Sequence, residues 1–375
     1  ILYRNMQGVV IDGCSFRAIY GSGLAIGASR SVIVRGNTFE NVYARQANSP
    51  DATGDAMSIY AYVRNLVVSG NIMQVQNGLT GRCGISVDDR TRNFTVSDNI
   101  VQGYERGIHI EHCLAGVISG NVVSRSAFAG MSSINRSVIW ANNIFDGDKQ
   151  TAADLLGYPG LFTTLNDTLC AYRGNTFRNW SGRTNTYLAK FWCHDSVIEN
   201  NIFEPNRASA QVYGYGYNYR NTYRNNEFRG GVQLLVHYNY NPTIVGNTFW
   251  GGTVETHNSE DAIVMNNIVQ PNVGSNTGSG LLIYNCTRPY VSGNTIINAA
   301  SYVIEQSLTT DGVFENNTYL RKHSSAVAYS TFFVSTGISA TGAKKTAADR
   351  YNVIRDYVST ANTYYVGNTG TPTAY

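Results

Sequence analysis

Charged residues are scarce in this sequence. Only 14% of its 375 residues are Asp, Glu, Lys or Arg, the formal net charge is +3, and no run of Lys or Arg forms a basic stripe. Nucleic-acid-binding proteins carry a basic footprint, so we expect no nucleic-acid partner. No apolar run approaches the roughly 18 residues that a membrane-spanning helix needs, so we expect no membrane insertion.

Proline and closely spaced cysteines are also few. The chain has 7 Pro, and its six Cys are widely separated without the C-x-x-C spacing typical of zinc sites. We therefore expect no metal and no cofactor, and free buried thiols that suit folding in a reducing compartment. No signal peptide opens the chain, which begins at Ile1 within a repeating pattern, so we expect the natural N-terminus to lie upstream.

A short repeat runs along nearly the whole chain. Its signature is Gly or Asn, then Asn, then usually Thr or Ile and an apolar residue, with a degenerate first copy around Cys14. From position 14 to position 317 the copies are about 25 residues apart, a period typical of solenoid proteins. The central Asn of the signature stands at positions 37, 71, 99, 121, 143, 175, 201, 226, 247, 267, 294 and 317.

The chemistry of this signature predicts the fold. Asn and Gly tolerate left-handed backbone angles, so each copy marks a bend between strands. An Asn at the same bend in every coil can pass amide hydrogen bonds to its neighbours and form a ladder. Short alternating segments around each bend indicate three strands per coil. We predict an all-β, right-handed, three-sheet parallel β-helix of about thirteen coils.

Two other repeat folds fit less well. A β-propeller has a longer repeat of about 40–45 residues, and a leucine-rich repeat demands Leu at fixed positions, which this chain does not have. The repeats resemble those of the right-handed β-helix family that includes pectate lyases, chondroitinase B-like lyases and bacteriophage tailspike depolymerases. The similarity covers residues 8 to about 320 and concerns architecture, so it specifies the fold more than the chemistry.

Within that family the chain most resembles a tailspike, because it is rich in Tyr and ends in a non-repeating tail. The resemblance implies a body (1–320) with a polysaccharide-binding groove, and a tail (321–375) that caps the body and joins three chains into a homotrimer. We expect a short helix over 344–358. The resemblance also implies a bacterial surface polysaccharide as partner and a place in the virion tail, assembled in the host cytoplasm and acting outside the cell.

Two long intervals locate a candidate catalytic site. The insertions at 40–55 and 146–160 leave the repeat at the same point, so they should border the coils between them. In one of those coils, alternation points Ile85 and Val87 inward and leaves Asp88 outward. One coil later it leaves His109 and Glu111 outward. Asp88 and Glu111 should then stack on neighbouring coils, as the two carboxyl groups of a glycosidase require.

Basic side chains surround this pair. Arg90, Arg106 and His112 are expected to hold an acidic sugar, and His109 is a third candidate catalytic group. Stacked carboxylates raise one another's proton affinity, as a general acid needs. The alternative is a solvated surface where Glu111 only pairs with Arg90 or Arg106.

An aromatic region supplies further candidate binding residues. Lys190 and Trp192 lie in one coil, and Tyr213 and Tyr215 alternate with Gly in the next, so we expect these rings outside, as platforms for sugar. Contact between subunits is an equal alternative. Acidic and imidazole groups nearby make the region a rival active site: His194, Asp195, Glu199, Glu255 and His257.

Three functions are compatible with these residues. The first is an endo-acting glycoside hydrolase that cleaves capsule or O-antigen with Asp88 and Glu111. The second is a polysaccharide lyase, which abstracts a proton beside a uronate carboxylate with a base such as His109 or Lys190. The third is a non-catalytic adhesin that binds glycan.

Overall fold

The computed structural model describes residues 2–43, 54–76, 79, 81–126, 128–147, 160–180, 187–206, 210–271, 279–299, 303–309, 311–322, 333–336, 348–350, 352–356, 364–366 and 372–374. The chain divides into two compact units, Ile1–Val197 and Ile198–Tyr375, and the boundary falls within β25 (Val197–Glu199). Each unit is a stack of coils, and each coil contributes one strand to each of three sheets.

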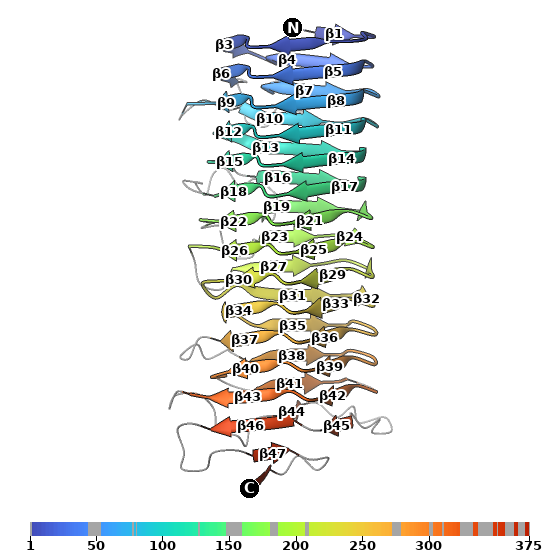
Figure 1. The fold of residues 1–375 in the computed structure, drawn as a ribbon, viewed down its shortest axis with the longest axis vertical. Helices are drawn as coiled ribbons and strands as arrows, with labels where there is room; N and C mark the ends of the chain where they lie inside the picture. Colours follow the sequence, from blue (N-terminus) through green and yellow to red (C-terminus); the bar gives the residue numbers. More distant parts are fainter. Residues whose placement is uncertain are drawn as a thin grey trace. The chain divides into compact units, whose positions relative to one another are not determined.

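In the first unit the strands of each sheet follow one another in chain order, as the blue to green part of Figure 1 shows. Sheet 1 contains β1 (Leu2–Arg4), β4 (Leu24–Gly27), β7 (Met57–Tyr60), β10 (Gly81–Val87), β13 (Tyr104–Glu111), β16 (Phe128–Ser133), β19 (Gly160–Leu165) and β23 (Tyr187–Phe191). Sheet 2 contains β2 (Val10–Asp12), β5 (Arg30–Arg35), β8 (Arg64–Ser69), β11 (Arg92–Ser97), β14 (Leu114–Ser119), β17 (Arg136–Ala141) and β21 (Ala171–Arg173), with β20 (Asp167–Thr168) and β24 (Cys193–His194) paired beside it. Sheet 3 contains β3 (Ser15–Tyr20), β6 (Thr38–Tyr43), β9 (Ile72–Gln74), β12 (Ile100–Gln102), β15 (Val122–Ser124), β18 (Ile144–Asp146) and β22 (Thr176–Arg178).

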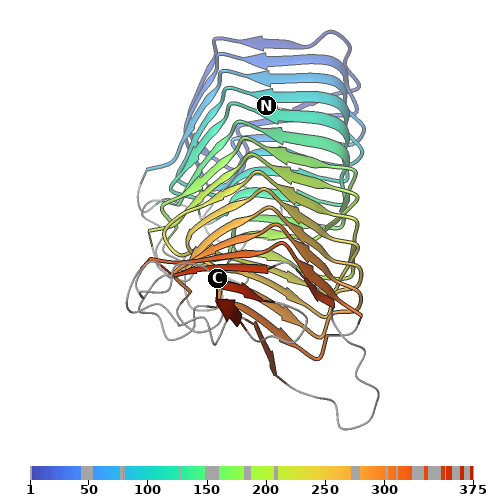
Figure 2. The same cartoon turned by 60° about the horizontal axis from the view of Figure 1, so that its bottom comes forward.

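The second unit repeats this arrangement, and Figure 2 shows its strands in yellow to red. They pair in parallel except for the last two of sheet 3, Tyr364–Val366 and Pro372–Ala374, which are added antiparallel. Sheet 1 contains β27 (Gln211–Gly214), β31 (Gln233–His237), β35 (Val254–His257), β38 (Leu281–Tyr284), β41 (Ile304–Ser307) and β44 (Phe333–Thr336). Sheet 2 contains β29 (Thr222–Arg224), β33 (Thr243–Val245), β36 (Ile263–Met265), β39 (Tyr290–Ser292), β42 (Val313–Glu315) and β45 (Ala348–Arg350). Sheet 3 contains β26 (Ile202–Glu204), β30 (Glu227–Phe228), β34 (Thr248–Gly251), β37 (Ile268–Pro271), β40 (Thr295–Ile297), β43 (Thr318–Arg321), β46 (Asn352–Asp356), β47 (Tyr364–Val366) and β48 (Pro372–Ala374), and β28 (Asn218–Tyr219) pairs with β32 (Asn239–Tyr240) separately.

The core is a set of apolar columns inside each stack. Val32 and Val34 of β5 are fully buried, and the next residue outward, Arg35, is exposed. Because parallel strands pair in register, like residues meet in successive coils: the rings of Phe16 and Phe39 stack with centroids 4.5 Å apart. The prediction of an all-β, three-sheet parallel solenoid is confirmed. The described part of the chain has no helix that is long and apolar enough to cross a membrane.

A buried ladder of asparagines connects the coils of each unit. In the first unit, the Nδ2 of each ladder residue donates to the Oδ1 of the next, at 2.9 Å, through Asn37, Asn71, Asn99, Asn121, Asn143 and Asn175. The second unit has the same ladder through Asn201, Asn226, Asn247, Asn267, Asn294 and Asn317. Each Oδ1 also accepts a backbone N–H, as Asn121 Oδ1 does from Asn99 N at 3.0 Å. The predicted ladder is therefore confirmed.

The two residues of each bend have separate tasks. The residue before the ladder Asn adopts left-handed backbone angles, for example Gly120 with φ 67° and Asn142 with φ 56°. The ladder Asn itself stays buried and bonds its neighbours. This division explains why Gly, Asn or Asp occupies the first position whereas only Asn occupies the second, since only Asn combines an amide donor with an amide acceptor at this length.

One local prediction was wrong. The segment 344–358 was expected to contain a short helix, but 348–350 and 352–356 are strands β45 and β46. They pair in parallel with β42 and β43, so the backbone groups are satisfied by the preceding coil rather than within a helix. Tertiary pairing outweighs the helix propensity of Ala and Lys in this segment.

The cysteine prediction holds with one exception. All six thiols are free, and five of them are buried: Cys83, Cys113, Cys170, Cys193 and Cys286. Cys14 is exposed instead of buried. It occupies the ladder position in the degenerate first copy of the repeat, where its backbone N–H donates to Asn37 Oδ1 at 2.9 Å.

Removal of one ladder amide should destabilise the protein strongly. In an Asn121→Ala variant, the buried backbone N–H of Asn99 and its Nδ2 lose their acceptor, and Asn143 Oδ1 loses a donor. We expect the free energy of unfolding to fall by about 2–4 kcal/mol, since a buried polar group left unsatisfied costs about 1–3 kcal/mol. Urea unfolding measures this. The exposed Asn206, changed to Ala, is the control, and equal midpoints for both variants would contradict the role of the ladder.

Candidate functional site

The two predicted carboxyl groups lie on neighbouring coils. Asp88 directly follows β10, and Glu111 ends β13. The strands pair in register, with Val87 opposite Ile110, so the next residue of each chain segment brings Asp88 beside Glu111. The expected inward residues Ile85, Val87, Ile108 and Ile110 are fully buried. Both carboxyl side chains are 31% exposed, so they are partly shielded and still accessible.

The environment of Asp88 favours its protonated form. Burial raises the pKa of Asp88 to about 6, and the nearby Glu111 charge acts in the same direction. The backbone N–H of Asp89, which donates to Asp88 Oδ1 at 2.6 Å, opposes the rise only in part. A carboxylic acid with a pKa raised toward neutral pH can donate its proton to a leaving group, which is what a general acid does.

His109 is buried, which corrects the expectation of an outward, accessible imidazole. It is 7% exposed, and its Nε2 lies 3.6 Å from Glu111 Oε2. Burial, together with the positive charges of Arg106 and Arg82, lowers the pKa of His109 to about 3. His109 is therefore neutral at physiological pH and contacts Glu111 from inside the surface. The alternation of the strand predicted that the His109 side chain points out of the core. It did not predict that residues of the neighbouring coils, Ser86 and Met131, would flank and bury the imidazole.

The three predicted basic residues lie around the pair in different ways. Arg90 Nη1 donates to Tyr62 Oη at 2.8 Å, and the guanidinium lies 5.4 Å from the centre of that ring. His112 Nδ1 is 4.0 Å from Asp88 Oδ1. Arg106 Nε is 3.9 Å from Glu105. In the described part of the chain, Glu111 forms no ion pair with Arg90 or Arg106, so the simple surface pairing considered from sequence does not occur.

Two neighbours of the site were missed from sequence. Asp89 lies beside Asp88, and one ligand atom from each of Asp88, Asp89 and His112 lies within 4.8 Å of the others, close enough to hold a metal ion. Tyr62 supports Arg90 from the preceding coil. The Asp-Asp pair was a visible signal for the first, whereas the Tyr62 contact depends on which residues the coil register aligns.

Most of the two predicted insertions lies outside the described residues. Residues 44–53 and 148–159 belong to that part, so the predicted loop walls stay predictions. Of the flanking residues, Asp146 accepts from Arg178 Nε at 2.8 Å and from Asn179 Nδ2 at 3.0 Å.

The predicted aromatic residues are divided between the two units. In the first unit, Lys190 Nζ lies 5.9 Å from the centre of the Trp192 ring, and burial lowers the pKa of Lys190. In the second unit, Tyr215 is 38% exposed, as expected for a platform. Tyr213 is only 9% exposed, which corrects its predicted outside position, because its ring packs against Tyr215 and His237.

Tyr213 belongs to a second group of titratable side chains on sheet 1 of the second unit. Its hydroxyl lies 3.0 Å from His237 Nδ1, and burial together with His257 lowers the pKa of His237 to about 4. The rings of His237 and His257 stack at 4.3 Å, and His257 Nε2 lies 3.5 Å from Glu255. The rival region named from sequence thus contains a Tyr–His contact that the sequence did not reveal.

The raised pKa of Asp88 predicts an unusual pH dependence of stability. The folded protein holds a proton on Asp88 between about pH 4, where an unfolded Asp ionises, and about pH 6. Ionisation in the folded state therefore costs stability, and the contribution of Asp88 falls as pH rises through this window. Asp88→Asn should raise the urea midpoint at pH 7 and leave it unchanged at pH 4. A lower midpoint at pH 7 would contradict the raised pKa.

Solved structures match most of this chain at low sequence identity. A tailspike protein of the E. coli bacteriophage HK620, in complex with a pentasaccharide, is 13% identical with a TM-score of 0.48. It matches 88% of this chain, which spans 58% of that chain. The surface adhesin PfbA of Streptococcus pneumoniae is 10% identical, covering 96% and 90% of the two chains with a TM-score of 0.49. The alginate lyase AlyF-OU02 is 11% identical, covering 99% and 86%, with a TM-score of 0.48.

No curated protein matches the sequence significantly. The family described as "Right handed beta helix region" does match, over residues 1–149 and 160–319. This match covers most of the chain and agrees with the three parallel sheets and the asparagine ladders of both units. The chain therefore belongs to the right-handed β-helix family.

Proposed function

We propose that this chain is an endo-acting glycoside hydrolase of the tailspike type, which cleaves a bacterial capsule or O-antigen. The observation that carries the proposal is the pair Asp88 and Glu111 on adjacent coils, with the pKa of Asp88 raised to about 6. A carboxylate that lowers stability when it ionises is typical of a functional site, since structure alone gives no reason to keep it.

In this mechanism Asp88 donates its proton to the glycosidic oxygen, and Glu111 acts as the base or the nucleophile. Retaining enzymes hold the two carboxyl groups about 5–5.5 Å apart and inverting enzymes about 6.5–9.5 Å. Neighbouring strands lie about 4.8 Å apart, so residues on adjacent coils are compatible with either mode. Neutral His109 lies beside Glu111, with its Nε2 3.6 Å from Glu111 Oε2, and is the third proposed catalytic-site residue. The reaction needs no cofactor.

The basic groups near the pair suit a negatively charged sugar. The proposed substrate contacts are Arg90 and His112, and Arg106 is a further source of positive charge. The Arg90 guanidinium is held in place by its contact with the Tyr62 ring. Lys190, Trp192, Tyr213 and Tyr215 remain proposed binding residues.

A second candidate reaction is β-elimination by a lyase. It is favoured by the Tyr213 hydroxyl at 3.0 Å from a neutral His237, since such a pair can remove a proton beside a carboxylate and return one to the leaving oxygen. Its products would contain an unsaturated ring that absorbs ultraviolet light.

The proposal extends to assembly and location. We propose that the tail, 321–375, caps the body and joins three chains, and that the homotrimer belongs to a virion tail, assembled in the host cytoplasm and acting on bacterial surface polysaccharide outside the cell. Parallel addition of β44, β45 and β46 to the preceding strands supports a capping role.

A screen of purified capsules and O-antigens tests the activity. Wild type should release new reducing ends from one polymer, and Asp88→Asn and Glu111→Gln should each lower kcat by about 100-fold or more, since general acid–base groups contribute roughly 10²–10⁴. Asp12→Asn, at an exposed ion pair, is the matched control. Products that absorb in the ultraviolet would favour the lyase, and intact polymer that stays bound would contradict cleavage.

Light scattering tests the trimer. One chain has a mass of 41.1 kDa, so we expect about three times that value at micromolar concentration. The mass of a single chain would contradict the proposed assembly.

A further inference from the structure

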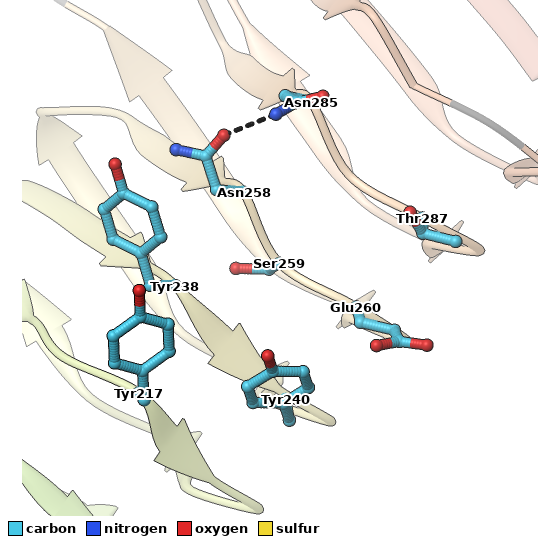
Figure 3. Close-up of a pocket in the computed structure, with 8 residues that line it drawn as sticks. All are labelled: Tyr217, Tyr238, Tyr240, Asn258, Ser259, Glu260, Asn285 and Thr287. Atoms are coloured by element: carbon cyan, nitrogen blue, oxygen red, sulfur yellow. Dashed lines mark hydrogen bonds between the residues drawn. The ribbon is translucent and has the colours of Figure 1, made fainter.

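A pocket of the second unit combines three tyrosines with several polar groups. It has a volume of about 240 Å³ and is lined by Tyr217, Tyr238, Tyr240, Asn258, Ser259, Glu260, Asn285 and Thr287 (Figure 3). These residues come from the corners that follow β27, β31, β35 and β38, where each coil passes from sheet 1 to sheet 2. Pockets for drug-sized ligands measure roughly 300–1,000 Å³, so this one suits a ligand as small as one sugar ring.

The tyrosines present their rings to solvent. Tyr217 is 67% exposed, Tyr238 41% and Tyr240 37%. Tyr217 and Tyr238 lie with ring centroids 6.0 Å apart, and Tyr240 stacks on Tyr219 at 5.0 Å. These contacts hold the rings in place without burying them. Such amphipathic rings suit the flat C–H face of a pyranose.

The polar side of the pocket suits hydroxyl groups. Asn285 Nδ2 donates to Asn258 Oδ1 at 2.6 Å, which orients the Asn258 amide. The Nδ2 N–H groups of Asn258 have no partner among the described residues, and Figure 3 shows this amide nitrogen on the side of Tyr238. Glu260 is held by Arg288, which donates to it at 2.5 Å.

Charge selects against an acidic sugar. Arg288 is shared between Glu260 and Asp261, so two carboxylates face one guanidinium. No Lys or Arg lines the pocket. A uronate would therefore be repelled, whereas neutral hydroxyl groups can donate to the Glu260 carboxylate.

The corner beside the pocket has a repeating backbone conformation. Tyr238, Asn258 and Asn285 occupy the same corner in three successive coils, with φ of 54°, 50° and 48°. Asn tolerates these left-handed angles, but a bulky Tyr there is strained. The chain keeps Tyr at this corner and exposes its ring to the pocket. Leu308 in the following coil and Ile134 in the first unit have the same φ of 53° after their sheet 1 strands, so the angle belongs to the coil and the exposed ring is what distinguishes Tyr238.

We infer that this pocket binds one neutral pyranose residue of a polysaccharide, with its face on Tyr217 and Tyr238 and its hydroxyl groups on Asn258 and Glu260. The inference deepens the proposed function by naming a sugar class, although binding here does not require cleavage.

Retention on immobilised polysaccharides tests it. The probes are biotinylated bacterial capsules and O-antigens, some made only of neutral sugars and others containing uronic acids. We expect retention on a polymer with neutral residues, weakened roughly two- to tenfold by Tyr217→Ala and again by Tyr238→Asn, since an aromatic contact contributes about 0.5–1.5 kcal/mol. Tyr20→Ala, at a tyrosine 63% exposed in the first unit, is the control and should bind like wild type.

The Tyr238→Asn substitution places at this corner the same residue type, Asn, that the next two coils have there. The thermal unfolding midpoint of this variant should therefore not fall. Wild-type retention by both pocket variants, retention only on uronate polymers, or no retention at all would overturn the inference. If either pocket variant had a different mass in solution from wild type, this face would be a contact between subunits, and that result would also overturn the inference. If a polymer is cut and the variants bind normally, only this inference fails; if it is held through the tyrosines but never shortened, only the proposed cleavage fails.

Discussion

The hydrogen bond between the side-chain amides of successive asparagines is the interaction on which both units depend. In the ladder, each inner Asn uses its Oδ1 for two donors and its Nδ2 for the next amide and for a backbone carbonyl of the preceding coil, as Asn121 does with Val96. Such an amide is fully satisfied while fully buried, which is the condition for placing polar groups inside a core. The ladder also aligns successive coils at the same residue. Every other position of the coil is thereby aligned as well, including those that face outward.

This alignment determines the chemistry of the surface. Residues at the same position of neighbouring coils are brought together whatever their separation in sequence, so Asp88 meets Glu111 and their charges interact. The same rule places Tyr238, Asn258 and Asn285 at one corner, beside the pocket that they line. A repeating backbone thus offers a fixed row of positions, and function arises where the side chains in a row depart from what folding alone prefers.

The candidate site was predictable in part. Alternation with a period of two placed Asp88 and Glu111 together, because it depends only on which residues fill the core. The burial of His109 and Tyr213 was not predictable, because it depends on residues of other coils: Ser86 and Met131 flank His109, and His237 packs against Tyr213. The strands at 348–350 and 352–356 were missed for a related reason. They are stabilised by pairing with strands of the preceding coil, and local propensity does not depend on those strands.

The sequence by itself determined the coil. A recurring Asn after a Gly, Asn or Asp specifies a left-handed bend and a buried amide at every copy, and both follow from the chemistry of those few residues. Only the tertiary structure decided which side chains are accessible and which are protonated. Exposure and pKa depend on the distance to groups in neighbouring coils, and a repeat of varying length brings a different set of neighbours to each position. The stacking of coils partly buries Asp88 and places the Glu111 charge beside it, and both effects raise the pKa of Asp88 to about 6.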